Sequence, residues 1–204
     1  MAMLINDESL EKRLQSERAA LGVDRFDEVW EGVYVMAAAP NHEHQRLVGR
    51  LTRVLDEVVA DRGLGDVLPG VNVSDRVDSW QDNYRIPDVA VLLNDSHAEN
   101  RGAFWFGGPD FAVEIASPND QTRQKLGFYA SVGTRELLII ERDPWQMELF
   151  RNDGETLVSA GLVKPADGVL INSEVVSLQL RFGSNKQTVS IEAIDPVDGK
   201  SWTL

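Results

Sequence analysis

Hydrophobic residues recur at helical spacing in one long segment near the start of the chain. The positions that share one side of such a helix are His44, Leu47, Val48, Leu51, Leu55, Val58 and Val59. Pro40 breaks the preceding segment, Asn41 offers a helix cap, and Gly63 marks the end. The spacing predicts an amphipathic helix over residues 43–61 whose apolar face packs against a sheet.

Three apolar runs, at residues 86–93, 111–116 and 137–140, predict buried strands. Apolar side chains occupy nearly every position instead of alternating with polar ones, so both faces of these strands should be covered, as at the centre of a sheet. Another run, at 67–74, predicts a further strand. We therefore expect an α/β protein with one mixed central sheet and the helix 43–61 on one of its faces.

The segment before the long helix predicts a surface helix and then a hairpin. Sparse leucines over residues 7–21 indicate the helix, with Asp7 as its N-cap. Strand-forming residues over 26–36, interrupted at Glu31-Gly32, predict two short strands joined by a turn.

A second buried helix is predicted directly after the run at 111–116. Ser117 serves as its cap, Pro118 takes the first helical position, and Asp120 completes a capping box. The helix runs to about residue 132, and Gly133 ends it.

The C-terminal residues 152–204 alternate short strand-like pieces with Gly and Pro, which indicates a β-rich extension and not a second domain. A chain of 204 residues is long enough for one domain with a sizeable core. We expect a single domain over residues 1–204, with its core at about 24–151.

The chain is acidic, with 33 Asp and Glu against 20 Lys and Arg and a net charge of −13. Such a chain repels phosphate backbones at long range, which argues against a high-affinity DNA-binding protein but not against a metal site built from carboxylates. The absence of cysteine excludes disulfides and thiolate ligands and fits a reducing cytoplasm. No apolar run approaches the roughly 20 residues of a membrane span, so we expect a cytoplasmic protein without a membrane partner.

Two carboxylates interrupt the buried runs. Asp88 begins one run and Glu114 lies within the next, and an ionised group at such a position must find a partner or a metal. Adjacent strands can bring both to one edge of the sheet, where their oxygens suit Mg²⁺ or Mn²⁺. Lys125, on the following helix, is placed to orient or deprotonate an attacking water or to neutralise charge on a phosphate.

Each of these residues also has an ordinary explanation. Asp88 can cap the turn after Pro87, Glu114 can pair with a basic residue, and Lys125 can extend its ammonium to the surface. Taken singly these explanations are favoured; the three together, in this order of elements, favour a site. A carboxylate-pair hydrolase of another substrate, such as a glycoside, leaves Lys125 without a role.

His44 has two interpretations, because it lies in the first turn of the apolar face of the predicted helix. The more common arrangement is a core histidine that bonds to a backbone carbonyl. The other is a side chain that reaches an active site at the helix N-terminus.

Several segments resemble, in the same order, the Uma-two family of restriction-endonuclease-like proteins, a branch of the PD-(D/E)XK nuclease superfamily. The matching residues are Trp30-Glu31-Gly32, Pro40 with His44-Gln45, residues 86–91, residues 109–118, and Lys125 followed by Tyr129 and Gly133. The resemblance implies a restriction-endonuclease-like core of helix, three strands, helix and strand, here with an N-terminal helix and hairpin and a β-rich C-terminal extension.

The resemblance also implies a set of site residues. Asp88, Glu114 and the backbone carbonyl of Ile115 would hold the metal. The superfamily usually has a lysine two residues after the glutamate, where this sequence has Ala116, so Lys125 would take that role from the following helix.

The activity implied is hydrolysis of DNA phosphodiester bonds by an activated water, with Mg²⁺ as cofactor and Mn²⁺ as its substitute. Glu31 and His44 match family positions that face the same pocket, and together with Ser117 they are candidates for supporting contacts. DNA would be bound weakly at physiological salt, and a homodimer is expected.

The alternative is a nuclease-fold protein that has lost catalysis and serves as a dimeric or DNA-associated interaction module. The acidic charge and the alanine in place of the strand lysine favour this alternative, whereas the presence of Asp88, Glu114 and Lys125 favours the enzyme.

Overall fold

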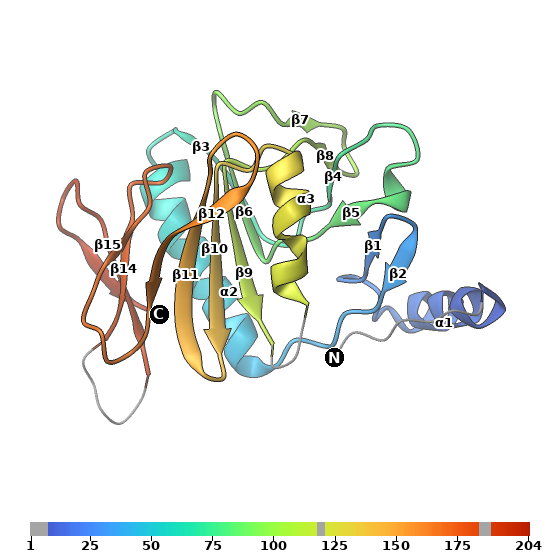
Figure 1. Cartoon of the computed structure of the whole chain (residues 1–204), viewed down its shortest axis with the longest axis horizontal. Coiled ribbons are helices and arrows are strands. Elements are labelled where there is room, and N and C mark those ends of the chain that lie inside the picture. The colour runs from blue at the N-terminus through green and yellow to red at the C-terminus, as the bar shows by residue number, and fades with distance from the viewer. Residues whose placement is uncertain (1–7, 118–120, 184–188) are drawn as a thin grey trace.

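The computed structural model describes residues 8–117, 121–183 and 189–204. Its centre is a six-stranded mixed sheet (Figure 1). In spatial order the strands are β12 (Leu157–Val163), β11 (Trp145–Asn152), β10 (Glu136–Arg142), β9 (Phe111–Ala116), β6 (Val89–Leu93) and β3 (Gly65–Leu68). β9 and β10 are parallel and the other neighbours antiparallel. The three apolar runs therefore lie side by side, as predicted.

The long amphipathic helix, α2 (His42–Leu55), forms where its spacing predicts it. The side chain of Asn41 accepts a hydrogen bond from the backbone N of His44 at 2.9 Å, which confirms Asn41 as the N-cap. The helix continues into a π-helical turn at Asp56–Ala60, and Gly63 follows with a left-handed φ of +67°. The predicted extent is thus confirmed, with a wider last turn.

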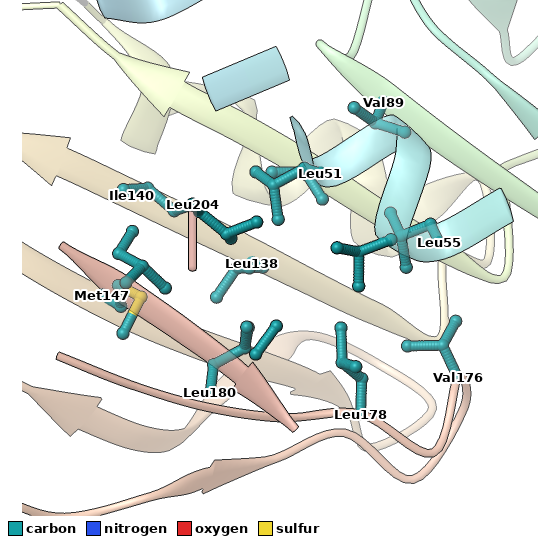
Figure 2. Close-up of a cluster of buried hydrophobic side chains, with 14 of the residues drawn as sticks. Leu51, Leu55, Val89, Leu138, Ile140, Met147, Val176, Leu178, Leu180 and Leu204 are labelled. Atoms are coloured by element: carbon teal, nitrogen blue, oxygen red, sulfur yellow. The ribbon is translucent and has the colours of Figure 1, made fainter. Parts of the chain in front are cut away.

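The larger apolar core lies on the face of the central sheet that α2 covers. Leu51 and Leu55 of α2 meet Leu138 of β10 and, from the C-terminal segment, Leu178 and Leu180 (Figure 2). Each of these leucines is at most 3% exposed, and burying such a side chain contributes roughly 1.5–3 kcal/mol. The C-terminal residues therefore share a core with the central sheet.

The C-terminal extension is β-rich, as the sequence predicts. It forms a four-stranded antiparallel sheet in which each strand pairs with the next. Its strands are β13 (Ile171–Asn172), β14 (Gln179–Phe182), β15 (Ile191–Ile194) and β16 (Ser201–Thr203). Figure 1 shows this sheet beside α2 at the edge of the molecule away from α1.

The other face of the central sheet is covered by a short helix, α3 (Leu126–Ser131), which follows a 3₁₀ turn at Thr122–Lys125. Phe128 and Tyr129 pack there against the strand residues whose side chains point away from α2. Gly133 ends the helix with a φ of +81°, as predicted. The predicted capping box includes Pro118 and Asp120, which lie outside the described residues.

A second sheet of six short strands stands beside the central one. In spatial order its strands are β2 (Val33–Val35), β1 (Glu28–Trp30), β5 (Tyr84–Arg85), β4 (Val73–Ser74), β8 (Trp105–Phe106) and β7 (Glu99–Asn100). The predicted hairpin is confirmed as β1 and β2, which turn at Glu31 and Gly32 with φ of 49° and 80°.

Two of the predicted strands are shorter in the structure than the sequence indicated. Residues 67–74 form β3 in the central sheet and β4 in the small sheet, because Pro69 and Gly70 redirect the chain between them. Residues 86–93 form a central strand only from 89 onward, since Pro87 has no N–H to offer a ladder. The break at Pro87 leaves Asp88 directly before the first residue of β6.

The N-terminal helix, α1 (Glu8–Leu21), projects from the small sheet (Figure 1). Arg18 donates two hydrogen bonds, at 2.6 and 2.7 Å, to the buried carboxylate of Asp27 and so ties the helix to the hairpin. The predicted cap, Asp7, lies outside the described residues. Every helix in the described part of the chain is too short or too polar to traverse a lipid bilayer.

Candidate active site

A cavity of about 540 Å³ opens between the β1–β2 hairpin, the first turns of α2 and the adjoining ends of β6 and β9. Asp88, Glu114 and Lys125 all line it, together with His44 and Ser117. The structure therefore gathers the three principal residues predicted from the sequence, and two of the supporting candidates, around one space.

Glu114 lies in the middle of β9, and its side chain points to the α3 face of the sheet. Alternation along the strand places it there, because Val113 and Ile115 belong to the core on the α2 face. Tyr129 donates its hydroxyl to one carboxylate oxygen at 2.6 Å, and the ammonium of Lys125 lies 3.0 Å from both oxygens. The carboxylate of Glu114, in an otherwise apolar strand, is therefore bound by two hydrogen-bond donors, Tyr129 of α3 and Lys125 of the turn before it.

Asp88 reaches the same place from the neighbouring antiparallel strand. Its Oδ2 accepts a hydrogen bond from the backbone N of Ile115 at 2.7 Å, one residue beyond Glu114. Its Oδ1 lies 3.2 Å from Nε2 of His44. The two carboxylates therefore meet where the start of β6 adjoins the end of β9, as the sequence predicts.

The structure decides between the two interpretations of His44. Its Nε2 faces Asp88 and not a backbone carbonyl, and the residue lines the cavity. Its Nδ1 is buried and has no hydrogen-bond partner in the part of the chain that the structure describes. His44 is therefore a residue of the site, carried there by the first turn of α2.

A third carboxylate, Glu28, was missed by the sequence analysis. Its Oε1 lies 2.9 Å from Nζ of Lys125 and also accepts the backbone N–H of Ile86 at 2.7 Å. Its Oε2 accepts the indole N–H of Trp30 at 2.7 Å. One feature of the sequence could have indicated Glu28. It lies two positions before Trp30 in a predicted strand, and side chains at that spacing point to the same face.

A buried guanidinium holds this hairpin against α3. Arg85 lies between two rings, 4.7 Å from the centroid of Trp30 and 4.4 Å from that of Phe128. It also donates to the backbone oxygen of Val29 at 2.8 Å. Because Trp30 in turn binds Glu28, this stack fixes the carboxylate that faces Lys125.

The electrostatics of the cluster are dominated by burial. Burial raises the pKa of Glu114 to about 8; the charge of Lys125 opposes this shift, and the charges of Glu28 and Asp88 add to it. Burial alone would lower the pKa of Lys125, but Glu114 and Glu28 outweigh it, so this pKa is raised and the lysine stays charged. Burial likewise raises the pKa of Tyr129 and keeps its phenol a donor.

This arrangement fits a divalent cation. Asp88, Glu114 and the carbonyl of Ile115 provide an all-oxygen donor set, which suits Mg²⁺ or Mn²⁺. The ammonium of Lys125 already lies as a cation against Glu114 and Glu28. The charges of Glu28 and Asp88 both disfavour ionisation of Glu114, so additional positive charge at this place is favourable. Among the described residues no three acidic or histidine side chains form a ligand group, so waters would complete such a shell.

Two of the expected supporting residues have different outcomes. Glu31 lies outside the cavity, contrary to what the resemblance implied, because its strained turn directs the carboxylate to Nδ2 of Asn83 at 2.6 Å and to Arg76 at 3.3 Å. Ser117 does line the cavity, and its hydroxyl lies 3.5 Å from a guanidinium nitrogen of Arg142.

Comparisons with known proteins identify a family and a fold. Residues 23–183 match the model of the family Uma2, described as "Putative restriction endonuclease". The structure is similar to a crystal structure described as "a putative nuclease belonging to DUF820" from Anabaena variabilis ATCC 29413. The two share 18% sequence identity with a TM-score of 0.59, over 74% of this chain and 83% of that one. No curated protein matches the sequence.

The structural match shows a shared fold, which is the restriction-endonuclease-like α/β architecture expected from the sequence. The family match covers most of the chain, including every residue of the site. The chain therefore belongs to the Uma2 family of restriction-endonuclease-like proteins.

Proposed function

We propose that this protein is a Mg²⁺-dependent endonuclease that hydrolyses phosphodiester bonds in DNA. The observation that carries the proposal is the buried contact between Glu114 and Lys125, set directly beside Asp88 at an open cavity. A purely structural ion pair has no need of a second carboxylate at its side, since that neighbour raises the cost of keeping Glu114 ionised.

Asp88, Glu114 and the backbone carbonyl of Ile115 are the ligands in this proposal, with Mn²⁺ able to replace Mg²⁺. When bound, the ion neutralises charge on the phosphate and favours deprotonation of the attacking water. The protein's own part is to hold these oxygens in place. The N–H of Ile115 orients Asp88, and the hydroxyl of Tyr129 orients Glu114.

Lys125 has a different role. Its ammonium is donor to two carboxylates, so Glu28 can keep it charged and oriented when Glu114 serves as a metal ligand. A lysine fixed at the wall of the cavity can then donate to a phosphate oxygen and balance the charge that develops as water attacks phosphorus and the P–O bond breaks. Lys125 therefore takes the part of the lysine that Ala116 replaces on the strand.

His44 positions Asp88. The imidazole lies against the carboxylate oxygen that does not bind the backbone, so both oxygens of Asp88 have defined partners. A carboxylate held on both sides loses little conformational freedom when it binds a cation, which favours metal affinity.

The second candidate function is an interaction module without catalysis. It is favoured by the acidic chain and by the full engagement of Lys125 with two glutamates. The deciding experiment is cleavage of circular single-stranded DNA, with nicking of supercoiled plasmid in parallel, at about 20–50 mM salt, where weak phosphate contacts are least screened.

Wild type with Mg²⁺ or Mn²⁺ is compared in that assay with EDTA-treated wild type and with Asp88→Asn. Cleavage by wild type that both EDTA and the substitution abolish supports the enzyme. A wild-type protein that cleaves no DNA, linear or circular, single- or double-stranded, supports the interaction module instead.

A further inference from the structure

The cavity that contains the carboxylates has a second, apolar part. Its wall is formed by residues of the hairpin and of the segments beside it, of α2 and of the segment before β6: Phe26, Trp30, Val35, Met36, Val48 and Ile86. The whole space of about 540 Å³ falls in the range of about 300–1,000 Å³ typical of sites for small organic ligands. A phosphate held beside Asp88 would therefore have room for an adjoining organic group in the same cavity.

The charged groups of the site are recessed within this space. The side chains of Asp88, Lys125 and Glu114 are only 19%, 12% and 6% exposed. In an intact duplex the phosphates lie on the outside of a wide cylinder and the bases are stacked within it. A strand that brings a phosphate to such recessed groups fits more easily when it is unpaired and can enter the cavity.

The charges of the cavity also disfavour a duplex. Among the described residues that line it, the side chains with a permanent positive charge are Arg25 and Lys125, and Lys125 is held by two glutamates. Duplex binding depends mainly on many lysine and arginine contacts to phosphates, which a chain of net charge −13 disfavours. Affinity must then come from another part of the nucleotide.

Aromatic side chains at the apolar wall offer that other source. Each of two rings, Phe26 and Trp30, already carries a guanidinium on one face: that of Arg25 lies 5.3 Å from the Phe26 centroid, and that of Arg85 lies 4.7 Å from the Trp30 centroid. Stacking of a base on such a ring is worth roughly 5- to 150-fold in affinity per base and requires an unpaired base.

We propose that the apolar part of the cavity binds a nucleobase, so that the substrate of this site is an unpaired DNA strand and not an intact duplex. The inference rests on the proposed function, because the base subsite and the phosphate site belong to one cavity. It adds to that function a substrate class and the surface that selects it.

Gly49 provides a way to block the subsite without touching the acidic cluster. It lies on α2 at the cavity, and a Cβ added there would meet no atom within 4 Å. Leucine at this position extends into the open space and also favours the helix. Gly127 on α3 is the matched control, because it is exposed like Gly49 and a Cβ added there also meets no atom within 4 Å, but it does not line the cavity.

The test measures binding of fluorescein-labelled DNA by anisotropy in EDTA, where the proposed hydrolysis cannot consume the probe. The probes are a 12-nucleotide single strand, the same strand with abasic residues at four central positions, and the corresponding duplex. We expect the single strand to bind at least about tenfold more tightly than the duplex or the abasic strand. Gly49→Leu should lose this tenfold preference for the single strand, and Gly127→Leu should retain it.

Equal binding of duplex and single strand, no binding of either, or an unchanged single-strand affinity in Gly49→Leu would overturn the inference. A cleavage assay with Mn²⁺ separates this result from the proposed function. If wild type cleaves duplex DNA and Gly49→Leu cleaves it equally well, the base subsite is wrong and the proposed nuclease activity stands. If the protein binds the single strand selectively but cleaves no DNA, the base subsite is supported and the proposed nuclease activity is wrong.

Discussion

Lys125 and Glu28 form a buried ion pair of 2.9 Å across 97 residues of sequence, joining the turn before α3 to the first strand of the hairpin. The pair gives Lys125 a carboxylate partner other than the proposed metal ligand Glu114. It therefore allows one lysine to stay charged and oriented whether or not Glu114 binds a cation.

Glu28→Gln should lower the rate of DNA cleavage about tenfold or more while changing Mn²⁺ affinity by less than about threefold. The single oxygen of the amide can still accept from Ile86, whereas its NH2 group cannot accept the indole N–H of Trp30. The amide also no longer holds the ammonium by charge, so Lys125 is left to Glu114 alone. Glu192→Gln, whose carboxylate binds Arg181 in the C-terminal sheet, is the matched control. A parallel loss of metal affinity in Glu28→Gln would make Glu28 a ligand and not a positioning residue.

Lys125→Ala should lower cleavage about 100-fold or more, with a much smaller effect on Mn²⁺ affinity. Loss of one preorganised donor to a developing charge has an effect of that order. Calorimetry with Mn²⁺ and cleavage of labelled single-stranded DNA measure the two properties separately. Lys164→Ala, at an exposed residue of the C-terminal segment, controls for loss of charge. If Lys125→Ala cleaves as fast as wild type, the lysine has no catalytic role.

Glu114→Gln should abolish Mn²⁺ binding, keep the fold and change the pH dependence of stability. The pKa of Glu114 is raised in the folded protein, so the stability linked to its proton is present below its unfolded pKa and is lost as pH rises through about 8. In EDTA, wild type should lose of order 1–3 kcal/mol between about pH 5 and 9 that the variant retains. Urea unfolding at several pH values measures this, and identical curves for the two proteins would contradict the raised pKa.

The affinity of wild type for Mn²⁺ should rise with pH, by at most about tenfold per unit, up to about pH 8. Glu114 must lose its proton before it can bind a metal, and burial keeps that proton on up to this range. Asp88→Asn should bind more weakly, and its rise should end at a lower pH, because the charge of Asp88 no longer helps to raise the pKa of Glu114. A flat affinity between pH 6 and 8 would show that Glu114 is not a ligand.

Much of this fold could be predicted from the sequence because its strongest patterns are local. The apolar runs at 111–116 and 137–140 are too continuous for exposed strands, and the stripe from Leu47 to Val59 has only a helical period. Asn41 could be predicted as an N-cap because it is a good capping residue that lies between Pro40 and the start of the apolar stripe.

The missed features depend on which sheet a segment joins. The residues before and after Pro69 favour strands equally. Only tertiary packing decides that those before it form β3 of the central sheet and those after it form β4 of the small sheet. The same limit applies to the site. Glu28 and Glu31 lie in one short hairpin, and the turn geometry decides that Glu28 points to Lys125 while Glu31 binds Asn83.

The most direct test of the central claim is anomalous diffraction from crystals soaked in Mn²⁺. A single peak is expected between the carboxylates of Asp88 and Glu114, within about 2.0–2.3 Å of an oxygen from each and near the carbonyl of Ile115. The same soak of Glu114→Gln should show no peak. Absence of the ion from wild type, with Glu114 still bound by Lys125, would contradict the account.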